Sequence, residues 1–233
     1  MKRILAISDI HGMHDEFVRL MKLIDYNPDD DHLVFLGDYV DRGPDSISCL
    51  QDIKRLTSTG AVALMGNHES MLLEVINDLE EGRLSSEDLK FGDDITGVYK
   101  TAYNLLFKMP YEESRKLIDF ISAMPLKHMA GKYVFAHAGY VPEHPFEMQS
   151  SHTLLWAKED FLRLKTPDNM CVIFGHTPTK YFGVDNDSIY KGVNRRGIDC
   201  GAVFGGNLAC FSINIASGAE TEYYVKCERK WKI

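Results

Sequence analysis

Cysteine is scarce in this 233-residue sequence, and its five cysteines include no CxxC pair. An odd number of cysteines without paired spacing argues against a disulfide framework and favours a reducing compartment. Long apolar runs are also lacking, since none reaches the roughly 7–15 residues of a secretory signal or the roughly 20 of a membrane-spanning helix. We therefore expect a cytoplasmic protein that has no membrane partner.

Basic residues are in deficit, because 26 lysines and arginines stand against 34 aspartates and glutamates, for a formal net charge of −8. This balance disfavours a nucleic-acid backbone as partner. The sequence also lacks repeats, low-complexity tracts and proline-rich linkers. With 45% hydrophobic and 26% charged residues it has the composition of an ordinary globular protein, and its length suits one domain spanning residues 1–233.

Five short apolar runs each end in residues that can bind a metal ion. A run of roughly four to six apolar residues closed by glycine or a polar residue predicts a buried strand. In open α/β sheets the ligand crevice lies outside the carboxyl ends of the strands, so we expect these end residues to meet at one rim. They are Asp9 and His11, Asp38, Asn67 and His68, His137, and His176.

The types of donor atom narrow the chemistry of this rim. Nitrogen and oxygen donors without a thiolate suit manganese, iron or zinc. Two such ions at one site are an arrangement used for phosphoryl transfer to water. The pattern therefore predicts a dinuclear metal site that acts on phosphoesters.

The first half of the chain alternates apolar runs with segments of helical spacing. Such alternation implies parallel strands with helices on the sheet faces. We expect an α/β fold in which helices flank the β-sheet. The expected strands are 3–8, 32–37, 61–65, 132–136 and 171–174, with helices around 17–24, 47–53, 72–79 and 152–165.

Two stretches depart from this alternation. Residues from about 81 to 126 contain no strand that ends in a donor, and residues 117–124 have helical spacing, so we expect a helical insertion beside the site. From about 190 to 227 the chain is β-rich. Strands are expected there at 202–204, 208–215 and 221–227, separated by glycine-containing turns as in hairpins.

Four short motifs contain the expected donors. The first is Asp9-Ile10-His11, in which side chains two apart in an extended segment point to the same side. The second, GDYVDRG at 37–43, is far more specific because it fixes five residues in seven, and its glycines permit a tight turn beside a ligand. GNHE at 66–69 and GHTP at 175–178 add two further turns that carry a donor.

In order and spacing these motifs, with later histidines in FAHAG and FGHTP, resemble those of the calcineurin-like metallophosphoesterases. Within them the chain is similar to the phosphoprotein phosphatases, above all to short bacterial and phage serine/threonine phosphatases such as lambda phosphatase. Pro178 stands where other branches carry a further histidine, and the segment DCGAVFGGNL at 199–208 resembles the tail motif of the phosphatases. The resemblance covers residues from about 3 to 215, and it implies a sandwich of central β-sheets flanked by helices.

The resemblance implies two divalent metal ions, with manganese as the first expectation and iron or zinc as alternatives. One ion would be held by three protein ligands and the other by four, with one aspartate shared. The first set is Asp9, His11 and Asp38, and the second is Asp38, Asn67, His137 and His176.

The resemblance also implies the roles of further residues. A hydroxide held between the metals would attack phosphorus in line, while His68, oriented by Asp41, would act as general acid for the leaving alkoxide. Arg42 would hold phosphate oxygens with two parallel donors, and Asn67 is counted among the substrate contacts. Lys158 stands where relatives carry a second phosphate-binding arginine. Lysine offers a point charge there, without the two parallel donors of a guanidinium group.

The function implied is hydrolysis of phosphomonoesters, first of all phosphoserine and phosphothreonine in proteins, with small phosphoesters as further substrates. The alternative within the same chemistry is a symmetrical dinucleoside polyphosphate hydrolase that cleaves diadenosine tetraphosphate. No residue of the 81–126 insertion or of the β-rich end distinguishes the two. A non-catalytic metal-binding scaffold is a third reading, which the presence of every ligand and of the acid pair disfavours.

Overall fold

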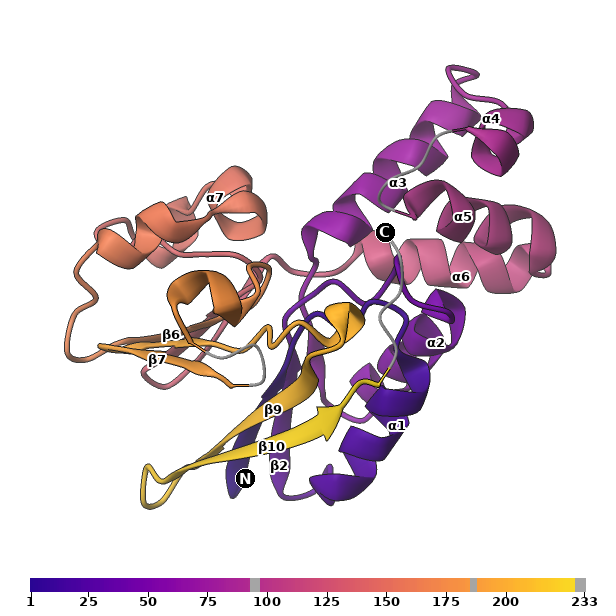
Figure 1. The fold of residues 1–233 in the computed structure, drawn as a ribbon. Coiled ribbons are helices and arrows are strands. Elements are labelled where there is room, and N and C mark those ends of the chain that lie inside the picture. Colours follow the sequence, from indigo (N-terminus) through magenta and orange to yellow (C-terminus); the bar gives the residue numbers. More distant parts are fainter. Residues whose placement is uncertain (93–96, 185–187, 229–233) are drawn as a thin grey trace.

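The computed structural model describes residues 1–92, 97–184 and 188–228, which form two five-stranded β-sheets with helices outside them (Figure 1). Sheet A has the strand order β10-β9-β1-β2-β3 and sheet B the order β4-β5-β6-β8-β7. The strands are β1 (Arg3–Ile7), β2 (Asp31–Phe35), β3 (Val62–Ala63), β4 (Lys127–Ala130), β5 (Tyr133–Ala136), β6 (Cys171–Phe174), β7 (Tyr190–Gly192), β8 (Arg195–Gly197), β9 (Asn207–Asn214) and β10 (Glu220–Lys226). The predicted α/β class with central sheets and flanking helices is confirmed.

The strands that precede the expected donors run parallel within each sheet. In sheet A, β1 pairs in parallel with β2, and β2 with β3. In sheet B, β5 pairs in parallel with β6. The remaining partners are mixed, since β9 and β10 form an antiparallel hairpin whose first strand pairs with β1, as the β-rich pattern after residue 208 predicted.

Within the described residues, seven α-helices and several shorter turns lie outside the sheets. The α-helices are α1 (His14–Leu23), α2 (Ser46–Thr57), α3 (Asn67–Glu80), α4 (Ser86–Phe91), α5 (Val98–Tyr103), α6 (Tyr111–Ser122) and α7 (Ser151–Trp156). The shorter turns are the π-helical η1 (Asn104–Lys108) and the 3-10 helices η2 (Phe146–Met148), η3 (Glu159–Arg163), η4 (Thr179–Phe182) and η5 (Ala202–Phe204). Among the described residues, no helix has the length and apolarity that a lipid bilayer would require.

The apolar core is divided among the layers. Alternate residues of β1 point to opposite faces, so Ile4 and Ala6 pack between the two sheets while Leu5 and Ile7 pack against the helices of sheet A. A third cluster, with Phe174 of β6, lies under α7 on the outer face of sheet B. Burial on both faces explains why residues 4–7 of β1 are all apolar, a pattern typical of a parallel sheet covered on both sides.

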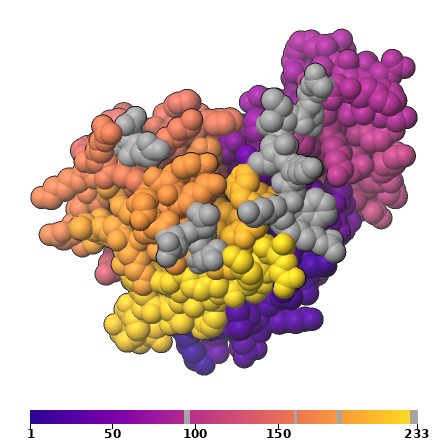
Figure 2. Space-filling model, in the orientation of Figure 1, coloured from indigo at the N-terminus to yellow at the C-terminus, as the bar shows by residue number. Residues whose placement is uncertain are grey.

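The stretch predicted as a helical insertion contains α4, α5, η1 and α6, with residues 93–96 outside the described part. Two of its helices contact α3, which follows β3. Figure 2 shows these residues, in magenta, gathered at one end of the visible face, away from the yellow C-terminal hairpin.

Three local predictions differ from the structure. Residues 202–204 form η5 instead of a strand, because Gly201 and Gly205 on either side have left-handed φ values of 70° and 86° and interrupt an extended path. The helix expected over 152–165 ends at Trp156, where Ala157 leaves the helical region, and resumes only as η3. Strand β4 has no predicted counterpart, since the burial of its residues does not alternate.

Candidate metal centre

Every donor predicted from the strand ends lies at the carboxyl end of β1, β2, β3, β5 or β6. Asp9 and His11 follow β1, Asp38 follows β2, and Asn67 opens α3 just after β3. His137 and His176 follow β5 and β6 of the other sheet. Within sheet B the Gly175 amide donates to His137 O over 2.7 Å, and between the two rims the His176 amide donates to Asp9 Oδ2 over 3.0 Å.

The backbone at this rim is held in a conformation that side chains disfavour. Eight non-glycine residues of the described chain have positive φ, and six of them are predicted site residues. A left-handed φ costs free energy and is retained where the surroundings enforce it, commonly at functional sites. The six are Asp9, His11, Asp38, Asp41, Arg42 and His176.

Two glycines allow the strand ends to approach one another. A Cβ atom on Gly66 would lie 2.2 Å from Asp38 Oδ1, and one on Gly175 would lie 2.2 Å from Asp9 Oδ2. Both distances are far below van der Waals contact, so a side chain at either position would displace a carboxylate. The glycines of GNHE and GHTP are therefore required by packing against the donors themselves.

One cluster of donor atoms lies around the Asn67 amide oxygen. Asn67 Oδ1 is 2.9 Å from His137 Nε2 and 2.9 Å from His176 Nδ1, and His137 Nε2 is 3.4 Å from Asp38 Oδ1. Ligand atoms about 2.1 Å from a common ion, at angles between about 90° and tetrahedral, would lie about 3.0–3.4 Å apart. The four side chains thus have the spacing of a ligand set.

Hydrogen bonding from the far side of each ring fixes the tautomer of two histidines. His137 Nδ1 lies 2.8 Å from Leu36 O and His11 Nδ1 lies 2.9 Å from Val40 O, and each carbonyl accepts the proton on that nitrogen. The Nε2 atom of each ring then presents a lone pair to the site. At His137 this lone pair faces another acceptor, Asn67 Oδ1, an arrangement that a cation between them would satisfy.

The second cluster shares Asp38 with the first. His11 Nε2 is 3.5 Å from Asp38 Oδ2, while Asp38 Oδ1 faces His137. The side chains of His11, Asp38 and His68 converge, as do those of Asp38, His137 and His176, so Asp38 belongs to both groups. Asp9 lies beside this second cluster, its carboxylate held by the His176 amide and by the Ser8 hydroxyl.

Burial gives three of the site histidines the neutral form that metal binding needs, whereas it favours the protonated form of Asp9. Burial lowers the pKa of His11 and of His137, and it lowers the pKa of His176 to about 3, so all three rings are neutral near pH 7. In contrast, burial and the negative charges of Asp199 and Asp38 raise the pKa of Asp9 well above its ordinary value. Divalent cations would compensate this concentration of buried carboxylates, so the residues fit a pair of such ions.

His68 differs from the other site histidines in its partner and its charge. Its Nδ1 lies 2.7 Å from Asp41 Oδ2, and both side chains are buried. Burial alone would lower the pKa of His68, but Asp38 and the hydrogen bond to Asp41 outweigh it and raise the pKa. Thr101 of α5 donates to the other oxygen of Asp41 over 2.5 Å, so the helical insertion reaches the site through this contact.

Arg42 lies within the site, whereas Lys158 lies outside its hydrogen-bonded network. Arg42 Nη1 donates to His11 Nε2 over 2.6 Å, and Arg42 Nε is buried without a partner among the described residues. Lys158 is exposed, two residues after Trp156, whose ring centre is 6.2 Å from that of His176. The structure therefore brings Arg42 to the donors and leaves Lys158 at the margin of the site.

Glu69 is a site residue that the sequence pattern did not assign. Its carboxylate is fully buried and accepts the backbone N–H groups of Asp38, Tyr39 and Gly66 over 2.8–2.9 Å. It thereby ties the turn that carries Asp38 to the start of α3. In sequence a glutamate in the first turn of a helix suggests only favourable interaction with the helix dipole, which is why its role was missed.

Glu69→Gln is expected to destabilise the protein by about 1–3 kcal/mol, because one of the two acceptor oxygens is replaced by a donor that faces buried N–H groups. Urea unfolding monitored by circular dichroism would measure this loss. Glu74→Gln, on an exposed position of the same helix, is the matched control and should unfold with the native midpoint. Equal midpoints for the two variants would show that Glu69 does not tie the turn.

The donors at the strand ends of the two sheets share one aspartate, Asp38. A buried His–Asp pair and an arginine lie beside them. This arrangement fits a metal-dependent phosphoesterase. Residues 2–206 match the calcineurin-like phosphoesterase family, and the chain belongs to it. The class of enzyme predicted from the motifs, a metal-dependent phosphoric ester hydrolase, is that of this family. The family, the fold and the resemblance on which they were predicted are confirmed.

Relatives with two different named activities match the chain. It is 31% identical over 176 residues to "Bis(5'-nucleosyl)-tetraphosphatase, symmetrical" of Nitrosospira multiformis, covering 75% of this chain and 57% of that protein. It is 29% identical over 221 residues to "Serine/threonine-protein phosphatase 1" of Salmonella typhimurium, covering 89% and 90%. The crystal structure of a metallophosphoesterase from Sphaerobacter thermophilus shares the fold, with a TM-score of 0.60 and 18% identity over 96% and 88% of the two chains. The chain spans about half the length of the tetraphosphatases that it matches and most of the Salmonella phosphatase.

Proposed function

We propose that the chain is a dinuclear metal-dependent phosphatase that hydrolyses phosphomonoesters, with phosphoserine and phosphothreonine in proteins as its first substrate class. The observation that carries this proposal is the position of Asp38. Its two carboxylate oxygens face His11 and His137, at 3.5 and 3.4 Å, so that one side chain is shared by two sets of donors. Two metals close together are the arrangement that suits attack of water on a phosphate.

We propose ligand sets that use the two clusters, with Asp9, beside the cluster of His11, Asp38 and His68, as a ligand in place of His68. Asp9, His11 and Asp38 would hold one ion, and Asp38 with Asn67 and the two later histidines would hold the other. Bound there, two divalent cations would lower the pKa of a water molecule and neutralise charge on the phosphate. Manganese is the first expectation and iron or zinc the alternatives, because nitrogen and oxygen donors without a thiolate accept all three.

The chain's own residues would position the substrate and supply a proton. Arg42 would donate two parallel hydrogen bonds to phosphate oxygens, and its buried Nε has no other partner in the described part of the chain. As the P–O bond breaks, protonated His68 would give a proton to the departing alkoxide oxygen. Asp41, held in turn by Thr101, would keep the ring oriented and stabilise its charged form. Lys158 stays a proposed, peripheral phosphate contact.

A second function, cleavage of dinucleoside polyphosphates such as diadenosine tetraphosphate, is supported by the Nitrosospira relative, whose name states that activity. The Salmonella phosphatase supports the first function and is matched over nearly its whole length. A non-catalytic scaffold is disfavoured because the acid pair and all six proposed ligands are present.

The two substrate classes can be separated by one assay. With manganese supplied, kcat/KM is measured for a phosphothreonine peptide, for p-nitrophenyl phosphate and for diadenosine tetraphosphate. We expect hydrolysis of the peptide and of p-nitrophenyl phosphate, with the peptide preferred to the dinucleotide. A strong preference for diadenosine tetraphosphate would establish the second function, and an enzyme inert toward all three would contradict both.

A further inference from the structure

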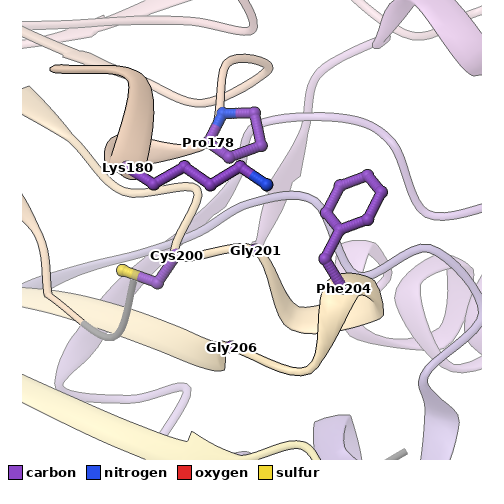
Figure 3. A pocket seen from close by; sticks show the side chains of 6 residues that line it. All are labelled: Pro178, Lys180, Cys200, Gly201, Phe204 and Gly206. Atoms are coloured by element: carbon purple, nitrogen blue, oxygen red, sulfur yellow. The ribbon is translucent and has the colours of Figure 1, made fainter. Parts of the chain in front are cut away.

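A small pocket beside the metal centre is lined by two side chains that the mechanism does not use. Its lining residues include Pro178, Lys180 and Phe204, together with the turn at Gly201. Figure 3 shows the Lys180 side chain extended along the pocket toward the Phe204 ring, below Pro178. Lys180 Nζ lies 5.3 Å from the centre of that ring.

The pocket is connected to the metal ligands through Arg42. The Arg42 guanidinium lies 5.6 Å from the same Phe204 ring, and its Nη1 donates to His11 over 2.6 Å. The two cations therefore lie near the same aromatic ring. The quadrupole of the ring attracts both charges.

The backbone on both sides of the pocket is fixed. The Thr179 amide donates to Asp199 O over 2.9 Å, which ties the turn carrying Lys180 to the segment that leads to Phe204. Gly201 and Gly205 hold the η5 turn on which Phe204 lies. The pocket is thus built by the GHTP turn and the 199–208 segment, both of which adjoin the metal donors.

The Lys180 ammonium group is available to a ligand. Lys180 is exposed, and within the described part of the chain no carboxylate lies at ion-pair distance from it. The buried Asp199 carboxylate interacts through space with both Arg42 and Lys180, but the hydrogen bond that it accepts comes from the Gly201 amide. An anion held by Arg42 at the metals would leave a second anionic group within reach of Lys180.

We propose that Lys180 and Phe204 form a subsite for a second anionic group of the substrate, next to the phosphate that is hydrolysed. The inference rests on the proposed function, and it narrows the substrates to phosphoesters that carry a further negative charge close to the reacting phosphate. That charge is a carboxylate beside a phosphorylated residue in an acidic peptide, or a further phosphate in a polyphosphate. Lys180 is then a specificity-determining residue that contacts substrate without taking part in bond cleavage.

The test compares Lys180→Met and Lys180→Arg with the unaltered enzyme in the presence of manganese. Two phosphothreonine peptides are used that differ only in flanking glutamates or glutamines, with p-nitrophenyl phosphate as a substrate that has one anionic group and diadenosine tetraphosphate as a polyphosphate. Lys180→Met should lower kcat/KM for the glutamate peptide about 5- to 10-fold, the effect of losing one charge-assisted contact. It should change p-nitrophenyl phosphate hydrolysis by less than about twofold, and Lys180→Arg should restore the peptide preference.

Lys132→Met is the matched control, because Lys132 also lies over an aromatic ring, that of Tyr133, but at the opposite end of β5 from the donors. It should behave as the unaltered enzyme. The preference for the glutamate peptide should also weaken as salt is raised from about 0.05 to about 0.3 M, which a purely structural role would not produce.

The outcomes separate the inference from the function on which it rests. A loss confined to diadenosine tetraphosphate would support the subsite and identify the second anion as phosphate. If Lys180→Met hydrolyses every substrate as well as the unaltered enzyme, or loses p-nitrophenyl phosphate hydrolysis in equal measure, the subsite is wrong while the phosphatase function stands. An unaltered enzyme that hydrolyses none of the substrates overturns both.

Discussion

Asp38→Asn should lose metal and turnover together. The carboxylate belongs to both donor clusters, and an amide has one acceptor oxygen and no charge, so one substitution weakens both proposed metal positions. We expect metal content to fall well below two ions per chain and kcat to fall by about 10³–10⁴-fold, since Lewis-acid stabilisation of a transferring phosphate contributes several kcal/mol. Metal analysis after gel filtration and the rate of p-nitrophenyl phosphate hydrolysis measure the two effects.

Asp52→Asn is the control for this variant. Asp52 pairs with His14 and Arg55 on the surface of α2, so its loss removes an aspartate–histidine contact without touching the site. It should keep both metals and native turnover. Full turnover of Asp38→Asn with two ions retained would contradict the shared ligand, and loss of turnover with both ions retained would restrict Asp38 to a role in catalysis.

The positions of the donors could be predicted from sequence because the physical signal is short and local. β1 is buried on both faces and is therefore apolar from Ile4 to Ile7, and the chain turns polar where the sheet ends. Parallel strands that end at the same edge of a sheet bring their last residues together. The strand order was therefore enough to predict that Asp9, Asp38 and Asn67 lie close to one another. The approach of His137 and His176 from a second sheet was not visible in the pattern, because nothing in a run of apolar residues states to which sheet it belongs.

The supporting residues could not be predicted because their roles depend on long-range contacts. Glu69 binds the backbone of residues about 30 positions earlier, and Thr101 reaches Asp41 from a helix 60 positions later. Neither contact leaves a periodic trace, since a glutamate in a first helical turn and a threonine in a short helix are common. The acids and imidazoles of the site can be recognised from their residue types in the sequence. The groups that hold them in place can be recognised only from their positions in the folded structure.

Local propensity was misleading where glycine or loop geometry overrides the side chains. The residues of η5 are apolar and β-compatible, yet Gly201 and Gly205 fold them into a turn that places the Phe204 ring near both Arg42 and Lys180. The early end of α7 likewise leaves Trp156 beside His176. Both departures occur next to the donors, where the backbone follows the requirements of the site before those of regular structure.

His68→Asn is expected to retain both metals and to slow hydrolysis of phosphothreonine peptide by about 10²–10⁴-fold. The ring is bound to Asp41, and its raised pKa favours the protonated form that a general acid needs, whereas the three neutral rings around Asp38 and Asn67 suit metal binding. Loss should be much smaller for p-nitrophenyl phosphate, whose leaving group departs with little need of a proton. Metal analysis and kcat for the two substrates separate the acid role from a ligand role.

The pH profile gives a second, independent reading of the same variant. Because Asp38 and Asp41 raise the pKa of His68 against the effect of burial, peptide hydrolysis by the unaltered enzyme should fall as pH rises through a value above the ordinary 6.5 or so of histidine. That basic limb should be missing in His68→Asn. His14→Asn, which breaks the other His–Asp pair at 2.9 Å, should leave rate and profile unchanged. Equal losses on good and poor leaving groups, or a metal content that drops with His68, would instead make this ring a ligand, with His11 and Asp38 as its partners in the second cluster.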